Sequence, residues 1–309
     1  MSFSLTVLGS SSALPTSKRF PTAQVLKVQE RFFLIDCGEG TQMQIRRFGL
    51  PLSRIHHIFI SHLHGDHVFG LFGLLSSMNL LGRNLDLTLH AHSSLEHTIK
   101  HFTSFFGTGL QFRIVFQPFP SRRTSLIYED NKVIVETIPL KHRIPTVGFV
   151  FREKKRPLNI RKDKVELLKI PYRDIINIKA GSDFISEDGK VFKNKDLTLP
   201  EIKSRSYAYI SDTAYHEKIT GLIQNVDLLY HESTFLECDR KLARLTGHST
   251  ALQAARIADK AGAEKLLIGH FSSRYKDVSA FVEEARKVFI NTFAVEDGDV
   301  FQVEQTREQ

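Results

Sequence analysis

The sequence lacks tryptophan and holds only two cysteines, Cys37 and Cys238, among 309 residues. Two cysteines are too few for a disulfide scaffold in a chain of this length, and they fit a reducing compartment. The N-terminus also lacks the basic region and apolar block of a secretion signal, and no apolar run is long enough to span a membrane. We therefore expect a cytoplasmic protein with no membrane span.

The composition is otherwise that of a globular protein whose charge is predominantly positive. Hydrophobic residues make up 41% of the chain, and 24 phenylalanines supply bulk for a core. A length of 309 residues fits a single large α/β domain that carries an insertion. The formal net charge of +8 favours an anionic partner such as nucleic acid or an anionic lipid surface.

Short apolar runs recur along the chain, and several end at a polar residue that can bind a ligand. Such runs are typical of strands whose C-terminal ends carry the chemistry. Helical periodicity lies between them, for example in Ala251, Ala255 and Ala258 behind the capping pair Ser249-Thr250. Strands that alternate with helices predict a layered α/β fold. The runs are residues 55–60, 207–210, 228–230 and 266–268, which lead into Ser61-His62, Ser211-Asp212, His231-Glu232 and Gly269-His270.

The middle of the chain breaks this alternation. Residues 152–179 contain ten lysines and arginines against four acids, and Pro157 and Pro171 restrict the backbone there. A second polar stretch follows at residues 182–203. We therefore expect one domain over residues 1–309, with an exposed basic arm inserted at residues 152–181.

The strongest chemical signal is the run Ser61-His62-Leu63-His64-Gly65-Asp66-His67, directly after a predicted strand. Imidazole and carboxylate are ligands that zinc accepts, and a site needs several of them on a rigid scaffold. Alternation puts the first two imidazoles on one side of an extended segment, while Gly65 permits a sharp turn before the next two ligands. A lone histidine would be an ordinary hydrogen-bonded residue, but four candidates within six positions predict two adjacent metal ions.

The same run matches the signature of the metallo-β-lactamase superfamily, whose αββα fold is two mixed sheets sandwiched between helices. Four further segments make the chain resemble the ribonuclease Z family of tRNA 3′-processing endonucleases over essentially its full length. The resemblance implies a zinc-dependent endoribonuclease that hydrolyses a phosphodiester, removes 3′ trailers from tRNA precursors and produces 5′-phosphomonoesters. The four segments are residues 33–42, 211–213, 231–234 and 247–250.

Carried over onto this sequence, the resemblance implies two Zn²⁺ ions per subunit. His142 taken alone would be a hydrogen-bonded loop histidine, and its position between the motifs favours the ligand role. Asp36 lies at a predicted strand end, where it either orients the histidine loop from outside or simply caps a turn. The implied ligands are His62, His64 and His142 for one ion and Asp66, His67 and His270 for the other, with Asp212 bridging the two.

Three residues are the candidates for proton transfer. Asp66 is the first choice for a base that orients or deprotonates the attacking water. The family assigns proton donation to the histidine that matches His248, and an imidazole with a pKa of about 6.5 can do this at neutral pH. The alternative is that His248 is incidental and that Ser249 or Thr250 caps a helix. Glu232 would support His248, or would be a solvent-facing loop residue.

The basic arm lies where the resembled enzymes grip the tRNA elbow, in a homodimer in which one subunit's arm serves the other's active site. Contacts between basic side chains and phosphates supply sequence-independent affinity, as such a grip requires. A solvated charged loop is the alternative, and residues 170–174 lack the Gly-Pro turn that is common in the family's arm. The expected substrate-binding residues are Lys154, Lys155, Arg156, Arg161, Lys162 and Lys164.

Two other functions compete with tRNA processing. Another two-zinc hydrolase of the superfamily, acting on a small phosphodiester, would need neither the basic arm nor the segment around His248. A non-catalytic RNA-binding scaffold would have no need to keep all seven metal ligands. Gly38 and Gly40 lie in a possible loop, but the full nucleotide fingerprint is missing, so we expect no nucleotide cofactor.

Overall fold

The computed structural model describes residues 2–105 and 109–307, which divide into two compact units. The first unit contains the chain up to Arg152 and Ser206–Val303, and the second contains Glu153–Arg205 with the C-terminal residues from Glu304. No helix in the described part of the chain is long and apolar enough to cross a membrane.

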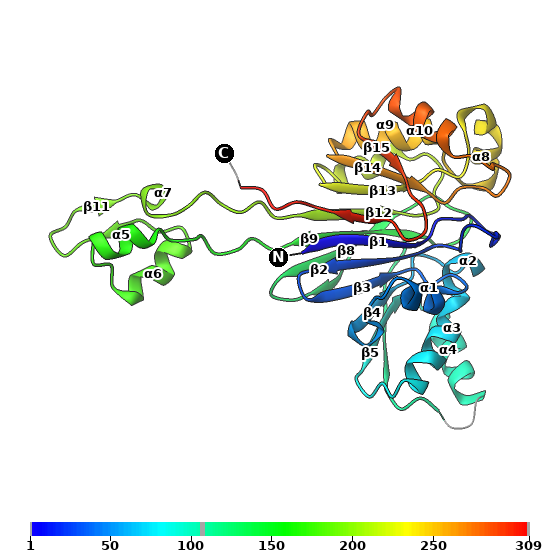
Figure 1. Ribbon diagram of the computed structural model, residues 1–309, viewed down its shortest axis with the longest axis horizontal. Coiled ribbons are helices and arrows are strands. Elements are labelled where there is room, and N and C mark those ends of the chain that lie inside the picture. Colours follow the sequence, from blue (N-terminus) through cyan, green and yellow to red (C-terminus); the bar gives the residue numbers. More distant parts are fainter. Residues whose placement is uncertain (1, 106–108, 308–309) are drawn as a thin grey trace. The chain divides into compact units, whose positions relative to one another are not determined.

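The first unit is built on two seven-stranded sheets (Figure 1). Their strand orders are β16-β1-β2-β3-β4-β5-β6 and β15-β14-β13-β12-β9-β8-β7. Neighbours from β3 to β6, and those from β12 to β15, are parallel. The strands of the first sheet are β1 (Phe3–Gly9), β2 (Ala23–Val28), β3 (Arg31–Ile35), β4 (Ile55–Phe59), β5 (Leu87–Ala91), β6 (Ile114–Pro118) and β16 (Val300–Gln302). Those of the second are β7 (Leu126–Glu129), β8 (Val133–Pro139), β9 (Val147–Glu153), β12 (Ser206–Ile210), β13 (Leu228–Glu232), β14 (Lys265–Gly269) and β15 (Thr292–Ala294).

The two sheets pack face to face through a core of large apolar side chains. Leu5 and Phe33 of the first sheet lie in one buried cluster with Phe149 and Tyr209 of the second. The rings of Phe59 and Phe149 meet edge to face, with their centroids 5.6 Å apart. Pairs of this kind contribute roughly 0.5–1.5 kcal/mol beyond their buried area. The contacts fix the two sheets against each other.

Helices cover the outer face of each sheet. Leu71, Leu74 and Leu75 of α3 pack in a buried cluster on the first sheet, and Ala254 and Ala258 of α9 pack in another on the second. The predicted α/β sandwich of two sheets between helices is therefore confirmed (Figure 1). The helices of this unit are α1 (Thr41–Arg47), α2 (Gly65–Val68), α3 (Gly70–Leu80), α4 (Ser94–Phe105), α8 (Arg240–Thr246), α9 (Ala251–Ala261) and α10 (Ser279–Arg286), with the short 3₁₀ helices η1 (Leu52–Arg54), η2 (Glu217–Leu222) and η3 (Glu237–Asp239).

The second unit has a small core of its own, formed by Ile170, Ile178, Phe184 and Leu197. The sequence-based range 152–181 ends after α6, whereas the unit continues to Arg205, because β10, β11 and α7 supply part of this core. At its base, the buried Glu153 carboxylate accepts hydrogen bonds from Nε and Nη2 of Arg205 at 2.9 and 3.0 Å. The elements are α5 (Lys162–Leu167), α6 (Tyr172–Lys179), β10 (Phe184–Ile185), β11 (Val191–Phe192) and α7 (Asn194–Leu197).

Candidate active site

The predicted site residues lie where strands of both sheets end. β12, β13 and β14 pair in parallel and in register. Because the carboxyl ends of parallel strands meet at one edge of a sheet, Asp212, Glu232 and His270 come together there. β4 of the facing sheet leads into residues 62–67, and Nε2 of His62 lies 3.5 Å from Oδ2 of Asp212. The site is therefore built between the edges of the two sheets.

The histidine run turns where α2 begins, at Gly65. His64 is extended, with φ −71° and ψ 150°, and Asp66 and His67 follow in the first helical turn. Gly65 itself has helical backbone, so the turn does not depend on the freedom of a glycine. A Cβ at this position would lie 2.4 Å from the ring of Phe69. A larger residue here would therefore displace the ring of Phe69.

One group of four side chains matches the first predicted ligand set. His62, His64, His142 and Asp212 offer ligand atoms that all lie within 4.8 Å of one another. Nδ1 of His64 lies 3.1 Å from Nε2 of His62 and 3.3 Å from Nε2 of His142. The loop after β8 delivers His142 to this point, although it is distant in sequence from the run.

A second group consists of Asp66, His67 and His270, whose ligand atoms also lie within 4.8 Å of one another. Nε2 of His67 lies 3.4 Å from Nε2 of His270. Asp212 connects the two groups, because its Oδ1 lies 3.2 Å from Nε2 of His270 while its Oδ2 faces His62. The structure thus brings all seven candidate ligands together, with Asp212 between the two groups.

The imidazoles are arranged to present lone pairs to a cation. Nδ1 of His142 donates to the carbonyl oxygen of Gly247 at 2.8 Å, so its neutral ring has an acceptor lone pair on Nε2. Nδ1 of His270 lies 2.9 Å from Oγ1 of Thr234. Burial lowers the pKa of the His62 imidazole to about 4, which favours the neutral ring that a metal ion requires. These donors fit a divalent metal ion, and imidazole nitrogen favours zinc among several candidates.

Asp36 holds the site from outside the two groups. Its Oδ2 lies 2.7 Å from Nδ1 of His67 and accepts hydrogen bonds from the hydroxyls of Ser61 and Tyr209 at 2.8 and 2.6 Å. Its Oδ1 accepts the backbone N–H of Ser61 at 2.7 Å. Asp36 is fully buried, so these donors compensate its charge. It orients the histidine run as the sequence suggested.

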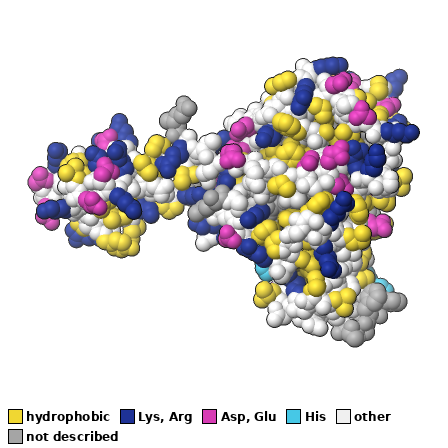
Figure 2. Space-filling model, in the orientation of Figure 1, with side chains coloured by type: hydrophobic (Ala, Val, Ile, Leu, Met, Phe, Trp, Pro, Cys, Tyr) yellow, Lys and Arg dark blue, Asp and Glu magenta, His cyan; other side chains and the backbone are white. Residues whose placement is uncertain are grey.

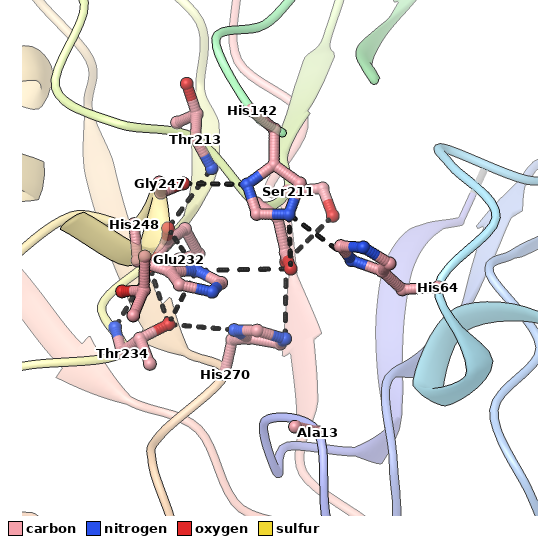
Figure 3. A network of polar contacts seen from close by, with 12 residues as sticks. Ala13, His64, His142, Ser211, Thr213, Glu232, Thr234, Gly247, His248 and His270 are labelled. Atoms are coloured by element: carbon pink, nitrogen blue, oxygen red, sulfur yellow. Dashed lines mark hydrogen bonds and ion pairs between the residues drawn. The ribbon is translucent and has the colours of Figure 1, made fainter. Parts of the chain in front are cut away.

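The buried Glu232 pairs with the partly buried His248 beside the candidate metal ligands (Figure 3). Oε1 of Glu232 lies 3.0 Å from Nδ1 of His248. Burial opposes protonation of His248, but the Glu232 carboxylate outweighs it and raises the pKa of the imidazole to about 9. Glu232 is 0% exposed, so the alternative of a solvent-facing loop residue is wrong. The raised pKa favours the protonated imidazole at neutral pH.

Gly247 sets the position of His248. It ends α8 in the left-handed conformation, with φ +78°, which a glycine adopts without strain. A Cβ there would lie 3.0 Å from Nδ1 of His142. The N–H of His248 then donates to the carbonyl of Ala243 at 2.8 Å, which ties His248 to the last turn of α8.

A cavity of about 680 Å³ opens onto both ligand groups. Sequence reasoning missed one of its polar contacts, the N–H of Ala13, which donates to Oδ2 of Asp66 at 2.8 Å. It also missed Thr234, whose hydroxyl lies between Glu232 and His270 (Figure 3). A backbone amide carries no residue signal, and the Ser-Thr pair after Glu232 was the only sequence clue to the second contact.

The six expected substrate-binding residues all lie in the second unit. Arg156 is paired with the buried Glu153 at 2.9 Å, and Lys155 with Glu201 at 3.3 Å. Arg161 precedes α5, and Lys162 and Lys164 lie within it. Figure 2 shows Lys and Arg side chains over the surface of this unit, interspersed with acidic and hydrophobic ones.

Comparison with known proteins identifies close relatives. A ribonuclease Z of Bacteroides fragilis is 49% identical over 290 residues, which cover 94% of this chain and 95% of that protein. A ribonuclease Z of Phocaeicola vulgatus is 47% identical over 290 residues, covering 94% of each chain. A family model described as Anti-Pycsar protein Apyc1 matches residues 3–143.

Solved structures agree with this relationship. The crystal structure of human tRNase Z, short form, has a TM-score of 0.70 at 25% identity and covers 96% of this chain and 98% of its own. The metallo-β-lactamase fold protein YhfI from Bacillus subtilis has a TM-score of 0.68 at 18% identity, covering 97% and 99% of the two chains, and shares the fold. The resemblance found in the sequence is confirmed, and the chain belongs to the ribonuclease Z family.

Proposed function

We propose that this protein is a cytoplasmic, metal-dependent endoribonuclease that removes 3′ trailers from tRNA precursors. The observation that carries the proposal is the pair of ligand groups joined by Asp212, with the protonated His248 beside them. The ribonuclease Z relatives cover nearly the whole chain and so include both units. Two zinc ions per subunit are the occupants that best suit these imidazole and carboxylate donors.

The reaction needs an activated water, charge neutralisation on the phosphate and a proton for the leaving oxygen. Divalent ions at the two groups would supply the first two, by lowering the pKa of a bound water and neutralising phosphate charge. His248 gives its proton to the 3′-oxygen as the bond between phosphorus and that oxygen breaks. Water oxygen is added to phosphorus, so the tRNA keeps a 3′-hydroxyl and the trailer leaves with a 5′-phosphate.

Glu232 and Asp66 have different tasks in this scheme. Glu232 stays ionised and accepts a hydrogen bond from Nδ1 of His248, which leaves the proton on Nε2 for transfer. Burial opposes ionisation of Asp66, but the neighbouring imidazoles of His67 and His270 hold the pKa of its carboxyl well below the usual range. A weak base of this kind orients the attacking water more effectively than it removes a proton. The N–H of Ala13 donates to Oδ2 of Asp66 and so fixes the oxygen that would orient the water.

The first test is cleavage of a tRNA precursor that carries a 3′ trailer. We expect one cut at the 3′ end of the acceptor stem, activity that a chelator abolishes, and recovery on adding zinc. Trailer ends are then analysed for a 5′-phosphate, and bound metal is measured by mass spectrometry. A protein that leaves the precursor intact but hydrolyses bis(p-nitrophenyl) phosphate would be a different hydrolase of the superfamily. A protein that binds precursor without cleaving either substrate would be an RNA-binding scaffold.

The second unit is proposed to be the arm that holds the tRNA. Its support is the basic character of residues 152–179 and the small independent core, which lets it fold as a module. Replacing residues 158–200 by a short glycine-serine linker keeps the Glu153–Arg205 pair. We expect the KM for precursor to rise roughly 10- to 100-fold through lost phosphate contacts, with a smaller salt dependence. Hydrolysis of bis(p-nitrophenyl) phosphate is the comparison, because equal losses on both substrates would mean that the segment supports folding.

A homodimer is proposed because large apolar side chains are exposed around α1 and α3. Contiguous exposed apolar surface commonly marks a protein interface. Light scattering of the full chain measures the mass, which should be twice that of one subunit. The exposed side chains are Met43, Phe69, Leu80, Leu81 and Leu85.

A further inference from the structure

A second cavity, of about 370 Å³, adjoins the active-site cavity at His248. His248 lines this cavity and also the one that opens onto the ligand groups. The two cavities therefore share the proposed proton donor as a common wall. The cavity lining includes Lys141, Tyr215, Arg240, Lys241, Arg244 and His248.

The cavity is lined by positive charge. Four of its lining residues are lysine or arginine, and none of the described residues that line it is acidic. Lys141, Lys241 and Arg244 form no ion pair with any residue that the structure describes, while Arg240 pairs with Glu237 at 3.3 Å. Unpaired cations gathered in a hollow raise the local concentration of an anion. Charge complementarity thus favours an anion, and phosphate is the anion that an RNA substrate offers.

One acidic residue near the cavity, Glu217, is already paired with other side chains. Glu217 accepts a hydrogen bond from the hydroxyl of Tyr215 at 2.5 Å and pairs with Lys260 at 2.6 Å. It therefore does not neutralise the lysines of the cavity. Tyr215 also presents a ring at the wall, which suits a sugar or base beside a phosphate.

The cations are held on a rigid support. Arg240 and Arg244 are four residues apart on α8 and so lie on the same face of that helix. Ala243 of the same helix is buried, and the N–H of His248 bonds to its carbonyl at 2.8 Å. Arg240, Lys241 and Arg244 are therefore connected to His248 through the same short helix. A phosphate bound there would set the register of the RNA relative to His248.

We propose that this cavity binds the RNA backbone phosphate on the 5′ side of the cleaved bond. The inference rests on the proposed function, in which His248 protonates the leaving 3′-oxygen. The nucleotide that carries this oxygen extends from the donor toward the mature tRNA. We place its own 5′-phosphate in the adjoining cavity, whose lining includes Lys141, Lys241 and Arg244. Arginine can bind two phosphate oxygens at once, which fixes orientation as well as affinity.

The first experiment removes charge from the cavity with the double variant Lys241→Ala/Arg244→Ala. Both residues are exposed, so the fold should persist. We expect the KM for the tRNA precursor to rise about 10- to 100-fold at unchanged kcat, because two solvent-screened contacts to a phosphate are lost. The KM for bis(p-nitrophenyl) phosphate, which has no neighbouring phosphate, is the reference. Lys287→Ala, an exposed lysine that follows α10, is the matched control.

The second experiment locates the phosphate by making it neutral. A precursor with a methylphosphonate at the next phosphate 5′ to the scissile phosphate is compared with one modified at the next phosphate 3′ to the scissile phosphate. We expect the 5′ modification to raise the KM of the wild type and to have no further effect in the double variant. The proposal would be overturned if the 5′ modification raised the KM equally in the wild type and the double variant. It would also be overturned if only the effect of the 3′ modification disappeared in the double variant. A wild type that does not cleave the unmodified precursor would instead refute the proposed function.

Discussion

Replacing Asp212 by alanine is expected to abolish phosphodiester cleavage and to release bound metal. The carboxylate is 2% exposed, and its two oxygens face different ligand groups, so the substitution removes a ligand from both. Even residues that only orient metal ligands contribute about 10- to 100-fold to affinity, and a shared ligand should contribute more. We expect a loss of at least about 1000-fold in kcat/KM. Metal content measured by mass spectrometry should fall from two ions per chain in parallel.

The control must separate loss of metal from loss of fold. Asp212→Asn keeps the shape of the side chain and one neutral oxygen, and Asp259→Ala removes an exposed carboxylate of α9. Circular dichroism and thermal unfolding are measured with and without added zinc. Zinc should raise the Tm of the wild type and of the Asp259 variant, because it binds the folded state, and should have less effect on both Asp212 variants. An Asp212 variant that keeps two ions per chain and full activity would contradict the bridging role.

Much of the fold was predictable, because buried parallel strands have a simple signature. Residues 207–210, 228–230 and 266–268 are nearly continuous apolar runs, and they form β12, β13 and β14. Strands buried on both faces have no polar alternation, so such runs identify them. The extent of the second unit was harder to predict. Its later part contributes mainly Phe184 and Leu197 to the core, and its strands of two residues are too short to give a period.

The metal ligands were predictable for a similar reason, since four of the seven lie within one short run. The burial of Glu232 was not, because two of the donors that compensate its charge come from other segments. The backbone N–H groups of Thr213, Thr234 and Ser249 all donate to its carboxylate, at 2.9 to 3.1 Å. Only the tertiary structure brings these groups together. The basic residues in the cavity beside His248 were also missed. The sequence of α8 has no recognisable motif, and only the tertiary structure brings its basic side chains close to His248.

Replacing His248 by alanine is expected to lower kcat for tRNA precursor by about 100- to 10,000-fold, the usual contribution of a general acid. The loss should depend on the leaving group. An RNA 3′-oxygen needs a proton as it leaves, whereas p-nitrophenolate is stable as an anion. The variant should therefore retain much more of its activity on bis(p-nitrophenyl) phosphate than on precursor. Equal losses on the two substrates, with metal content unchanged, would mean that His248 does not donate the proton.

Glu232→Gln tests the same assignment through pH. The reaction requires the protonated form of His248, so activity on precursor should fall as pH rises through the imidazole pKa, which Glu232 raises to about 9 against the effect of burial. Removing the carboxylate charge lowers that pKa, and the alkaline decline should move to lower pH. The His248→Ala variant should lose this limb altogether. A purely structural role for Glu232 would reduce activity and Tm at every pH without moving the limb, so the pH profile distinguishes a group that tunes the proton donor from one that only holds the loop.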